Sequence, residues 1–174
     1  MHRVLFALIV LRLSGSSIPA PTISQESGSR LRLYHTHTGE RLDVVYRRGD
    51  AYQPEALNRL DHFLRDHRTG EIHHFDPRLF DLLSDLTGAV GRPGAEIDII
   101  CGYRTPWSNQ FLRTHTTGVA KNSLHMQAEA IDIRLPGTQL SEFRDAALAL
   151  HRGGVGYYAS SDFIHVDIGR VRRW

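Results

Sequence analysis

The chain has 174 residues, 41% of them hydrophobic, and a formal net charge of +2 at pH 7. This length and apolar content are enough to bury one core, so we expect a single compact domain. The nearly balanced charge gives no argument for nucleic acid as a partner, because nucleic-acid-binding domains carry a clear excess of lysine and arginine.

Residues 1–20 have the pattern of a secretory signal peptide. A basic start at His2 and Arg3 precedes the apolar run VLFALIVL, and small and polar residues follow. The run is too short and too interrupted for a transmembrane span. A strand or helix of the core is the alternative, but charge, length and position favour an exported, periplasmic protein with no transmembrane span once mature. Residues 21–30 are then a linker, and residues 31–174 are the folded domain.

Two runs with the alternation of β-strands flank Thr38-Gly39 and predict a hairpin at the start of the domain. His35 and His37 lie near its turn. Alternation puts both on one face, which makes them candidate metal ligands. Polar residues on the solvent-facing side of a hairpin are the commoner explanation, so we expect exposed histidines here.

Two amphipathic helices follow the hairpin. Residues 54–67 carry leucines at helical spacing, and Asp76-Pro77 supplies the N-cap and the first-turn proline of a second helix. The leucines that we expect in the core are Leu57, Leu60, Leu64, Leu79, Leu82, Leu83 and Leu86.

The second half of the domain alternates strands and helices. Residues 95–101 indicate a buried strand ending at the only cysteine, Cys101, which we expect to be a small buried hydrophobic residue rather than a nucleophile. Further elements follow: a short helix after GYRTP, a strand at 130–135, a helix at 140–150, and strands at 155–158 and 163–168. The order of elements predicts an α+β domain in which helices flank a small, mainly antiparallel sheet.

The runs SLHMQAEAID and DFIHVD contain candidate metal ligands: His125 and Asp132 in the first, His165 in the second. Alternation puts Asp132 and His165 on the faces of their strands opposite the aliphatic residues. If the two strands pair, both side chains can reach one ion, and His125 can reach it from the preceding loop. Two imidazoles and a carboxylate can hold zinc and leave one position open for water, as catalytic zinc sites do. Hydrogen-bonded or surface histidines are the alternative explanation.

Four motifs together, GYRT, SLHMQAEAID, GGVGYY and FIHVD, resemble those of the zinc peptidases of the D-Ala-D-Ala carboxypeptidase and VanX type, and are most similar to the YcbK-like murein endopeptidases. The similarity extends from about Leu31 to Trp174. It implies the Hedgehog/D-Ala-D-Ala-peptidase-like zinc fold, one zinc ion per chain, and hydrolysis of amide bonds in peptidoglycan stem peptides or their cross-links. Peptidoglycan is then the expected partner.

The resemblance also implies roles for single residues. The family motif S-x-H-x-x-G-x-A-x-D makes Ser123 a substrate contact and His125 and Asp132 zinc ligands, and the third ligand is His165. Arg104 matches the arginine that holds the substrate or polarises the scissile carbonyl. A structural salt bridge is the alternative for Arg104, and a turn hydrogen bond is the alternative for Ser123.

The chain departs from the family where the motif has glycine, which is Ala128 here, and where relatives have threonine after HVD, which is Ile168. Alanine only tightens the turn if its φ angle is negative. Relatives take as general base an acidic residue three before the last histidine or a histidine two before it. Phe163 excludes the second pattern, and Asp162 fits the first if the chain bends just before the strand. Asp167 is the rival, better placed to orient a ligand.

Zinc chemistry supplies the expected mechanism. Three protein ligands leave a water molecule in the fourth position, its pKa falls to about 7, and a carboxylate removes its proton as it attacks the carbonyl. Arg104 shares the developing negative charge with the ion. Trp107, Tyr157 and Tyr158 are candidates to line the groove, although aromatic residues beside glycines often pack in the core.

A peptidoglycan-binding module that keeps the fold but has lost hydrolysis is the alternative function. Two features support this alternative: the general base has two candidates, and alanine replaces the motif glycine at position 128. The intact set of three metal ligands favours the enzyme. The sequence leaves open which peptide bond is cut and the oligomeric state.

Overall fold

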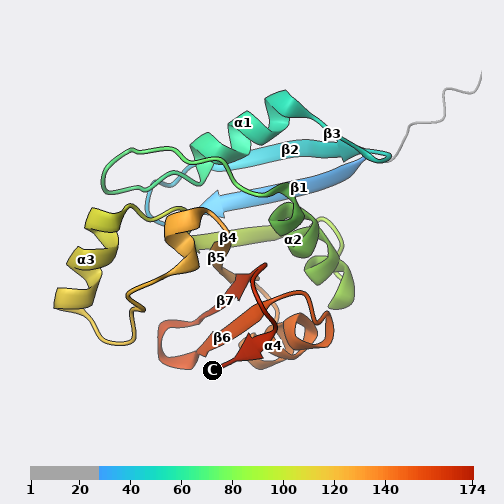
Figure 1. Ribbon diagram of the computed structural model, residues 1–174. Coiled ribbons are helices and arrows are strands. Elements are labelled where there is room, and N and C mark those ends of the chain that lie inside the picture. The colour runs from blue at the N-terminus through green and yellow to red at the C-terminus, as the bar shows by residue number, and fades with distance from the viewer. Residues whose placement is uncertain (1–27) are drawn as a thin grey trace, which may run out of the picture.

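A computed structural model describes residues 28–174, and the predicted signal peptide and nearly all of the predicted linker lie outside the described residues. An eight-stranded sheet forms the centre of this part, in the order β3-β2-β1-β4-β5-β7-β6-β8 (Figure 1). Its strands are β1 (Ser29–His35), β2 (Arg41–Arg48), β3 (Ala51–Tyr52), β4 (Glu96–Cys101), β5 (Ala130–Arg134), β6 (Gly154–Tyr158), β7 (Phe163–Asp167) and β8 (Arg172–Arg173). Strand β1 begins at Ser29, so the last residues of the predicted linker belong to the sheet.

Helices and helical turns connect these strands. They are α1 (Pro54–Phe63), α2 (Pro77–Ala89), α3 (Pro106–His115) and α4 (Leu140–Ala149), with two 3₁₀ turns, η1 (Leu124–Gln127) and η2 (Ala159–Ser161). Only β1–β4 and β6–β8 pair in parallel, and every other strand pair in the described part is antiparallel. The predicted α+β class with a mainly antiparallel sheet is therefore confirmed.

Alternation and helical spacing determine which side chains enter the core. Leu31 and Leu33 of β1 are buried while Arg32 between them is exposed, as expected for a strand with one solvated face. The leucine stripe of α2 is buried, and Asp76 caps this helix by accepting from the backbone N–H of Arg78 at 2.9 Å. Helix α2 packs on β1 and on α4, and α4 packs on β6 and β7, so the two helices together cover both the early and the late strands of the sheet.

Helix α1 is shorter than the sequence predicts, ending at Phe63 rather than His67. The residues after it form tertiary hydrogen bonds instead of another helical turn. The carbonyl of Leu64 accepts from the N–H of Tyr103 at 2.8 Å, and the carboxylate of Asp66 accepts from the N–H of Thr105 at 2.8 Å. These long-range partners are invisible to a helical pattern, which explains the error.

The expectation of an exposed His35 is wrong. Its side chain is fully buried because β1 lies between β2 and β4, and Phe63 and His67 cover the end of the strand, each with its ring centroid 5.8 Å from that of His35. Burial lowers the pKa of His35 to about 4, so the imidazole is neutral at pH 7. His37 is exposed, as expected, and stacks on His67 with the ring centroids 4.1 Å apart.

Asp66 joins the loop after α1 to the start of α3. Its carboxylate is almost fully buried and accepts from the N–H and hydroxyl of Thr105, at 2.8 and 2.9 Å, and from the N–H of Arg68 at 2.9 Å. Thr105 in turn caps α3 by accepting from the N–H of Ser108. Because Arg104 immediately precedes this cap, Asp66 determines where Arg104 lies.

Replacing Asp66 by alanine is expected to lower the free energy of unfolding by about 2–4 kcal/mol, because buried donors lose their acceptor. Urea denaturation measures this. Asp85→Ala, which removes a surface ion pair with Arg152, is the control and is expected to cost less than about 1 kcal/mol. Equal losses for the two variants would contradict the role of Asp66.

Candidate active site

Three neighbouring strands bring the candidate ligands together. Strand β5 lies between β4 and β7, and its Asp132 is directly opposite His165 of β7 on one side and Cys101 of β4 on the other. His125 reaches the same place from η1, which immediately precedes β5. The structure thus brings the three sequence-predicted ligands to one point.

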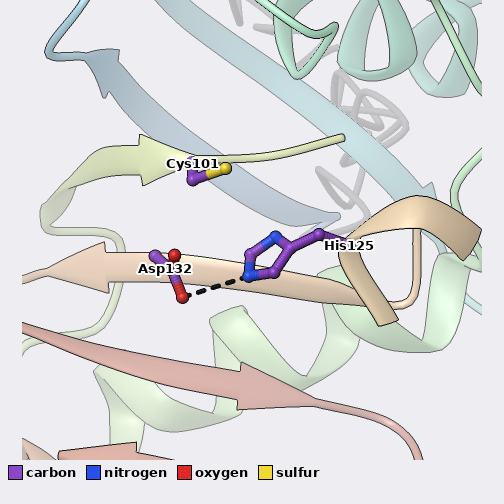
Figure 2. Close-up of side chains that lie close together, drawn as sticks. All are labelled: Cys101, His125 and Asp132. Carbon is purple, nitrogen blue, oxygen red and sulfur yellow. Dashed lines mark hydrogen bonds and ion pairs between the residues drawn. The ribbon is translucent and has the colours of Figure 1, made fainter. Parts of the chain in front are cut away.

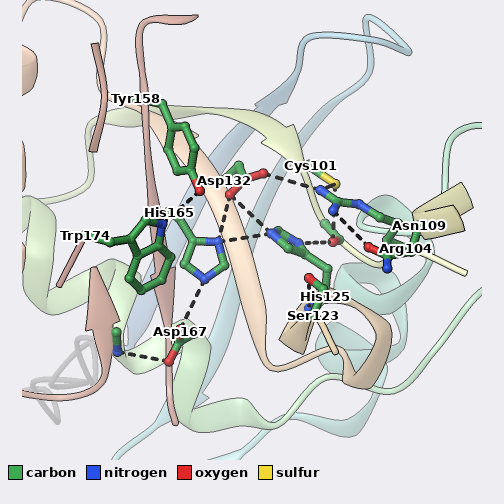
Figure 3. Close-up of polar contacts among 12 residues, drawn as sticks. Cys101, Arg104, Asn109, Ser123, His125, Asp132, Tyr158, His165, Asp167 and Trp174 are labelled. Carbon is green, nitrogen blue, oxygen red and sulfur yellow. Dashed lines mark hydrogen bonds and ion pairs between the residues drawn. The ribbon is translucent and has the colours of Figure 1, made fainter. Parts of the chain in front are cut away.

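The three side chains present their ligand atoms to one another. Nε2 of His125 lies 3.2 Å from Oδ1 of Asp132 and 3.1 Å from Nδ1 of His165, and Nδ1 of His165 lies 2.9 Å from the same carboxylate oxygen (Figure 3). Zinc–ligand distances of about 2.0–2.2 Å in a tetrahedron put ligand atoms about 3.3–3.6 Å apart. The observed spacing is slightly smaller, so the donor set fits one such ion with little movement.

Turn η1 holds His125 in place. Ser123 precedes the turn, and its hydroxyl accepts from the N–H of His125 at 3.4 Å, which is the turn role considered for this residue. Ala128 ends the turn with a φ of +54°, so the condition of a negative φ is not met. A left-handed alanine costs about 1–2 kcal/mol relative to glycine. Its buried methyl group offsets part of this cost.

Hydrogen bonds behind the cluster orient both imidazoles. Nδ1–H of His125 donates to the carbonyl of Gly102 at 2.8 Å, and Nε2–H of His165 donates to Oδ2 of Asp167 at 3.1 Å. In the neutral imidazole each bond puts the N–H on the outer nitrogen, so the nitrogen that faces the cluster has its lone pair free for a metal ion once the ring is deprotonated. Gly102 has to be glycine, because a Cβ there would lie 2.4 Å from the carbonyl oxygen of Leu64.

Asp167 is not available to a water molecule in the groove. It is fully buried, and both carboxylate oxygens are used: they accept from His165, from the N–H groups of Gly154 and Gly169 at 2.9 Å, and from Arg172 at 2.7 and 3.1 Å. Burial alone would raise the pKa of Asp167, but these donors hold it well below its usual range. The contacts of Asp167 are those expected of a side chain that orients His165.

The charges in the cluster favour a cation at its centre. Burial alone lowers the pKa of His125, yet the carboxylate of Asp132 and the side chain of Cys101 raise it to about 10. The pKa of Asp132 moves the other way: burial raises it, but His125 and His165 hold it well below its usual range. A positive charge is therefore favoured beside the buried carboxylate of Asp132, and either a proton on His125 or a bound cation would supply it.

Cys101 was expected to be an inert core residue, but it borders the cluster. Its ligand atom and those of His125 and Asp132 all lie within 4.8 Å of one another (Figure 2). The set of His125, Asp132 and His165 is tighter, and both of its imidazoles are oriented by hydrogen bonds, so these three remain the candidate ligands. The sulfur of Cys101 instead contacts Nη2 of Arg104 at 3.4 Å. Only the pairing of β4 with β5 reveals this position.

Arg104 lies beside the cluster and is held there by contacts with neighbouring side chains. Its Nη1 donates to Asn109 at 3.3 Å, and its Nη2 lies 3.7 Å from Oδ2 of Asp132, the oxygen that does not face the imidazoles. Its Nε is buried and has no hydrogen-bond partner within residues 28–174. The guanidinium as a whole lines the groove described next, and its positive charge suits it to bind an oxygen of a ligand.

A groove of about 380 Å³ opens over the cluster. One wall comes from the end of α3 and the segment up to η1, and the other comes from β6, η2, β7 and the C-terminal residues. The side chains that line it include Arg104, Ser123, Tyr158, Phe163, Arg172 and Trp174. Trp107 and Tyr157 do not line this groove. Trp174 does, although the alternation pattern gave no signal for a strand at residues 172–174.

Asp162 stands at the rim of this groove. Asp162 ends η2 with a φ of +52°. The chain therefore bends just before β7, which is the bend that the sequence requires if Asp162 is to act as the base. Its carboxylate is 62% exposed and pairs with Arg134 at 3.0 Å, and Arg134 also pairs with Asp98. Its neighbours Ser161 and Phe163 line the groove, whereas Asp162 itself does not.

Two oriented imidazoles and one carboxylate beneath an open groove are the arrangement expected of a metal-dependent hydrolase. Residues 24–174 match the family of the peptidoglycan L,D-endopeptidase MepK, and the chain belongs to this family. The membership confirms the family that the sequence predicts, and with it a peptidase as the class of enzyme.

Curated relatives are similar over almost their whole length. The chain is 40% identical over 176 residues to the peptidoglycan L,D-endopeptidase MepK of Escherichia coli K12, covering 99% of this chain and 96% of that protein. It is 39% identical over 167 residues to the probable peptidoglycan L,D-endopeptidase MepK of Haemophilus influenzae, covering 94% and 90%. No solved structure matches the chain significantly.

Asp167→Asn tests the support of His165. The substitution keeps the shape of the side chain but removes the anion behind His165, so affinity for zinc is expected to fall about 10–100-fold. Competition with a chromophoric chelator measures the affinity. Asp145→Asn, on the exposed face of α4, is the matched control and is expected to bind zinc like the wild type. Unchanged affinity in a folded Asp167→Asn variant would contradict the role of Asp167.

Proposed function

We propose that the chain is a zinc-dependent murein endopeptidase that hydrolyses amide bonds in the cross-links of peptidoglycan. The observation that carries the proposal is the cluster of His125, Asp132 and His165 at the floor of an open groove. Relatives named L,D-endopeptidases support an L,D bond as the target. An open groove suits a polymeric substrate that cannot enter a closed cavity.

Zinc is the ion that this donor set fits best, because two imidazoles and a carboxylate are typical ligands of catalytic zinc. When bound, zinc polarises a carbonyl as a Lewis acid and lowers the pKa of a water molecule to about 7. The chain contributes the rigid frame: Gly102 and Asp167 fix the two imidazoles, and Arg104 lies beside the free oxygen of Asp132.

Arg104 and Ser123 are the proposed substrate contacts. The guanidinium of Arg104 lines the groove beside the cluster, where a fixed positive charge stabilises negative charge that develops on a carbonyl or carboxylate oxygen of the substrate. The hydroxyl oxygen of Ser123 accepts from His125, and its O–H points to no acceptor within the described residues. Both side chains line the groove.

Asp162 is the proposed general base. The carboxylate is tied to Arg134 by a largely exposed ion pair, and such pairs contribute only about 0–1 kcal/mol. Release from Arg134 is therefore inexpensive, and the residues on either side already line the groove. Asp167, the rival, has no free oxygen.

Export to the periplasm is part of the proposal. The signal-peptide pattern of residues 1–20 supports it, and so does the location of peptidoglycan outside the cytoplasmic membrane. Within residues 28–174, no helix has the length and apolar character needed to cross a membrane.

Incubation of zinc-loaded protein with purified cross-linked sacculi is expected to release uncross-linked muropeptides, identified by mass spectrometry. Defined dimers joined through D,D or L,D bonds show which bond is cut, and cleavage of the L,D dimer is the expected result. His125→Ala, Asp132→Ala and His165→Ala are expected to lose both zinc and turnover. Binding to sacculi without any product would instead favour a non-catalytic module.

Asp162→Asn tests whether Asp162 acts as the general base without contributing to metal binding. The variant is expected to keep zinc and lose activity by at least about 100-fold, since general-base catalysis contributes about 10²–10⁴-fold. Turnover of a muropeptide dimer and zinc content are measured on the same sample, with Asp85→Asn, which breaks another surface ion pair, as control. Normal turnover by Asp162→Asn would show that Asp162 is only a partner of Arg134.

A further inference from the structure

The C-terminal Trp174 is fixed against the metal-ligand cluster. Its indole lies over Gly156, the residue paired with His165 in the sheet, and a Cβ at Gly156 would come within 2.7–2.8 Å of the indole ring. The indole centroid is 5.2 Å from that of His165, and the guanidinium of Arg172 lies 4.9 Å from the indole centroid. The backbone of Trp174 bonds to β6, through its N–H to Val155 and its carbonyl to the N–H of Tyr157.

The same indole orients Tyr158. Nε1–H of Trp174 donates to the phenolic oxygen of Tyr158 at 2.9 Å. The ring of Tyr158 stacks on Phe163, its partner across β6 and β7, with centroids 4.6 Å apart. Two independent contacts therefore determine where the hydroxyl group lies.

The hydroxyl proton of Tyr158 remains unused. The phenolic oxygen accepts from Trp174, so the O–H is directed elsewhere, and no acceptor for it exists among residues 28–174. Tyr158 lines the groove, and Figure 3 shows it with Trp174 on the side of the ligand cluster opposite Arg104. A rigid, partly exposed donor thus faces the space where the proposed substrate has to lie.

We propose that Tyr158 is a substrate-binding residue whose hydroxyl donates a hydrogen bond to a peptide carbonyl or carboxylate oxygen of the cross-link, and that Trp174 is the residue that positions this hydroxyl. The inference rests on the proposed function. It adds a second donor on the wall opposite Arg104, so the substrate is held from both sides of the cluster. Trp174 acts through Tyr158 and does not itself contact the reacting atoms.

Neighbouring Tyr157 supplies a matched control. It alternates to the other face of β6, where Arg144 lies over its ring at 4.6 Å, and it borders a different hollow. Tyr157→Phe and Tyr158→Phe remove the same single oxygen from adjacent positions, one outside the groove and one inside it.

The test compares turnover of a defined cross-linked muropeptide dimer by zinc-loaded full-length variants. Tyr158→Phe is expected to lower kcat/KM roughly tenfold, the effect of about one hydrogen bond to substrate. Trp174→Phe keeps an aromatic ring over Gly156 but loses the N–H, and is expected to lower kcat/KM about threefold. The double variant is expected to match Tyr158→Phe alone, because Trp174 acts only through that hydroxyl.

Several outcomes would overturn the inference. Wild-type turnover by Tyr158→Phe, an equal loss in Tyr157→Phe, or multiplied losses in the double variant each contradict it. A loss of turnover in Tyr158→Phe accompanied by a loss of zinc or a lower unfolding midpoint also contradicts it, because it indicates a structural role. A wild-type protein that cleaves no dimer refutes the proposed function itself, whereas cleavage by the wild type and Tyr158→Phe at equal rates refutes only this inference.

Discussion

The site depends on the antiparallel pairing of β5 with β7 in one particular register. This pairing sets Asp132 directly opposite His165, so an oxygen and a nitrogen lie 2.9 Å apart on the same face of the sheet. A shift by one residue would turn one of the two side chains into the aliphatic core and destroy the cluster. Ile131, Ile133, Ile164 and Val166 bury the opposite face, so the hydrophobic core that stabilises the sheet also holds the ligands in register.

Two buried aspartates in this strand pair have different tasks because their partners differ. Asp132 faces two imidazoles and shares its second oxygen with Arg104, which suits it to hold a cation. Asp167 lies behind His165 and is saturated by backbone N–H groups and Arg172, so it stays ionised without being reachable. The arrangement favours the tautomers of both imidazoles that ligation requires, and it is the reason for proposing Asp162, rather than Asp167, as the general base.

Different interactions hold the side chains on the two sides of the groove in place. Arg104 is held from below by Asn109 and by the loop that Asp66 secures, so it is a buried charge placed by hydrogen bonds. Tyr158 stacks on Phe163, Trp174 packs over the backbone of Gly156, and one hydrogen bond joins Trp174 to Tyr158. Rigidly held donors would lose little freedom on binding the proposed substrate, and such preorganisation favours catalysis by orientation.

Alternation, caps and short motifs are local properties, so they were enough to predict the class of fold, the family, and which residues are chemically able to bind a metal. They did not determine where α1 ends, that His35 is buried, that Ala128 is left-handed, or that Cys101 and Trp174 border the cluster. Each of these depends on contacts between segments far apart in the chain, such as Leu64 with Tyr103 or Gly156 with Trp174, and no local pattern encodes such contacts. Only the folded sheet decided that His125, Asp132 and His165 lie within about one ion's reach of each other.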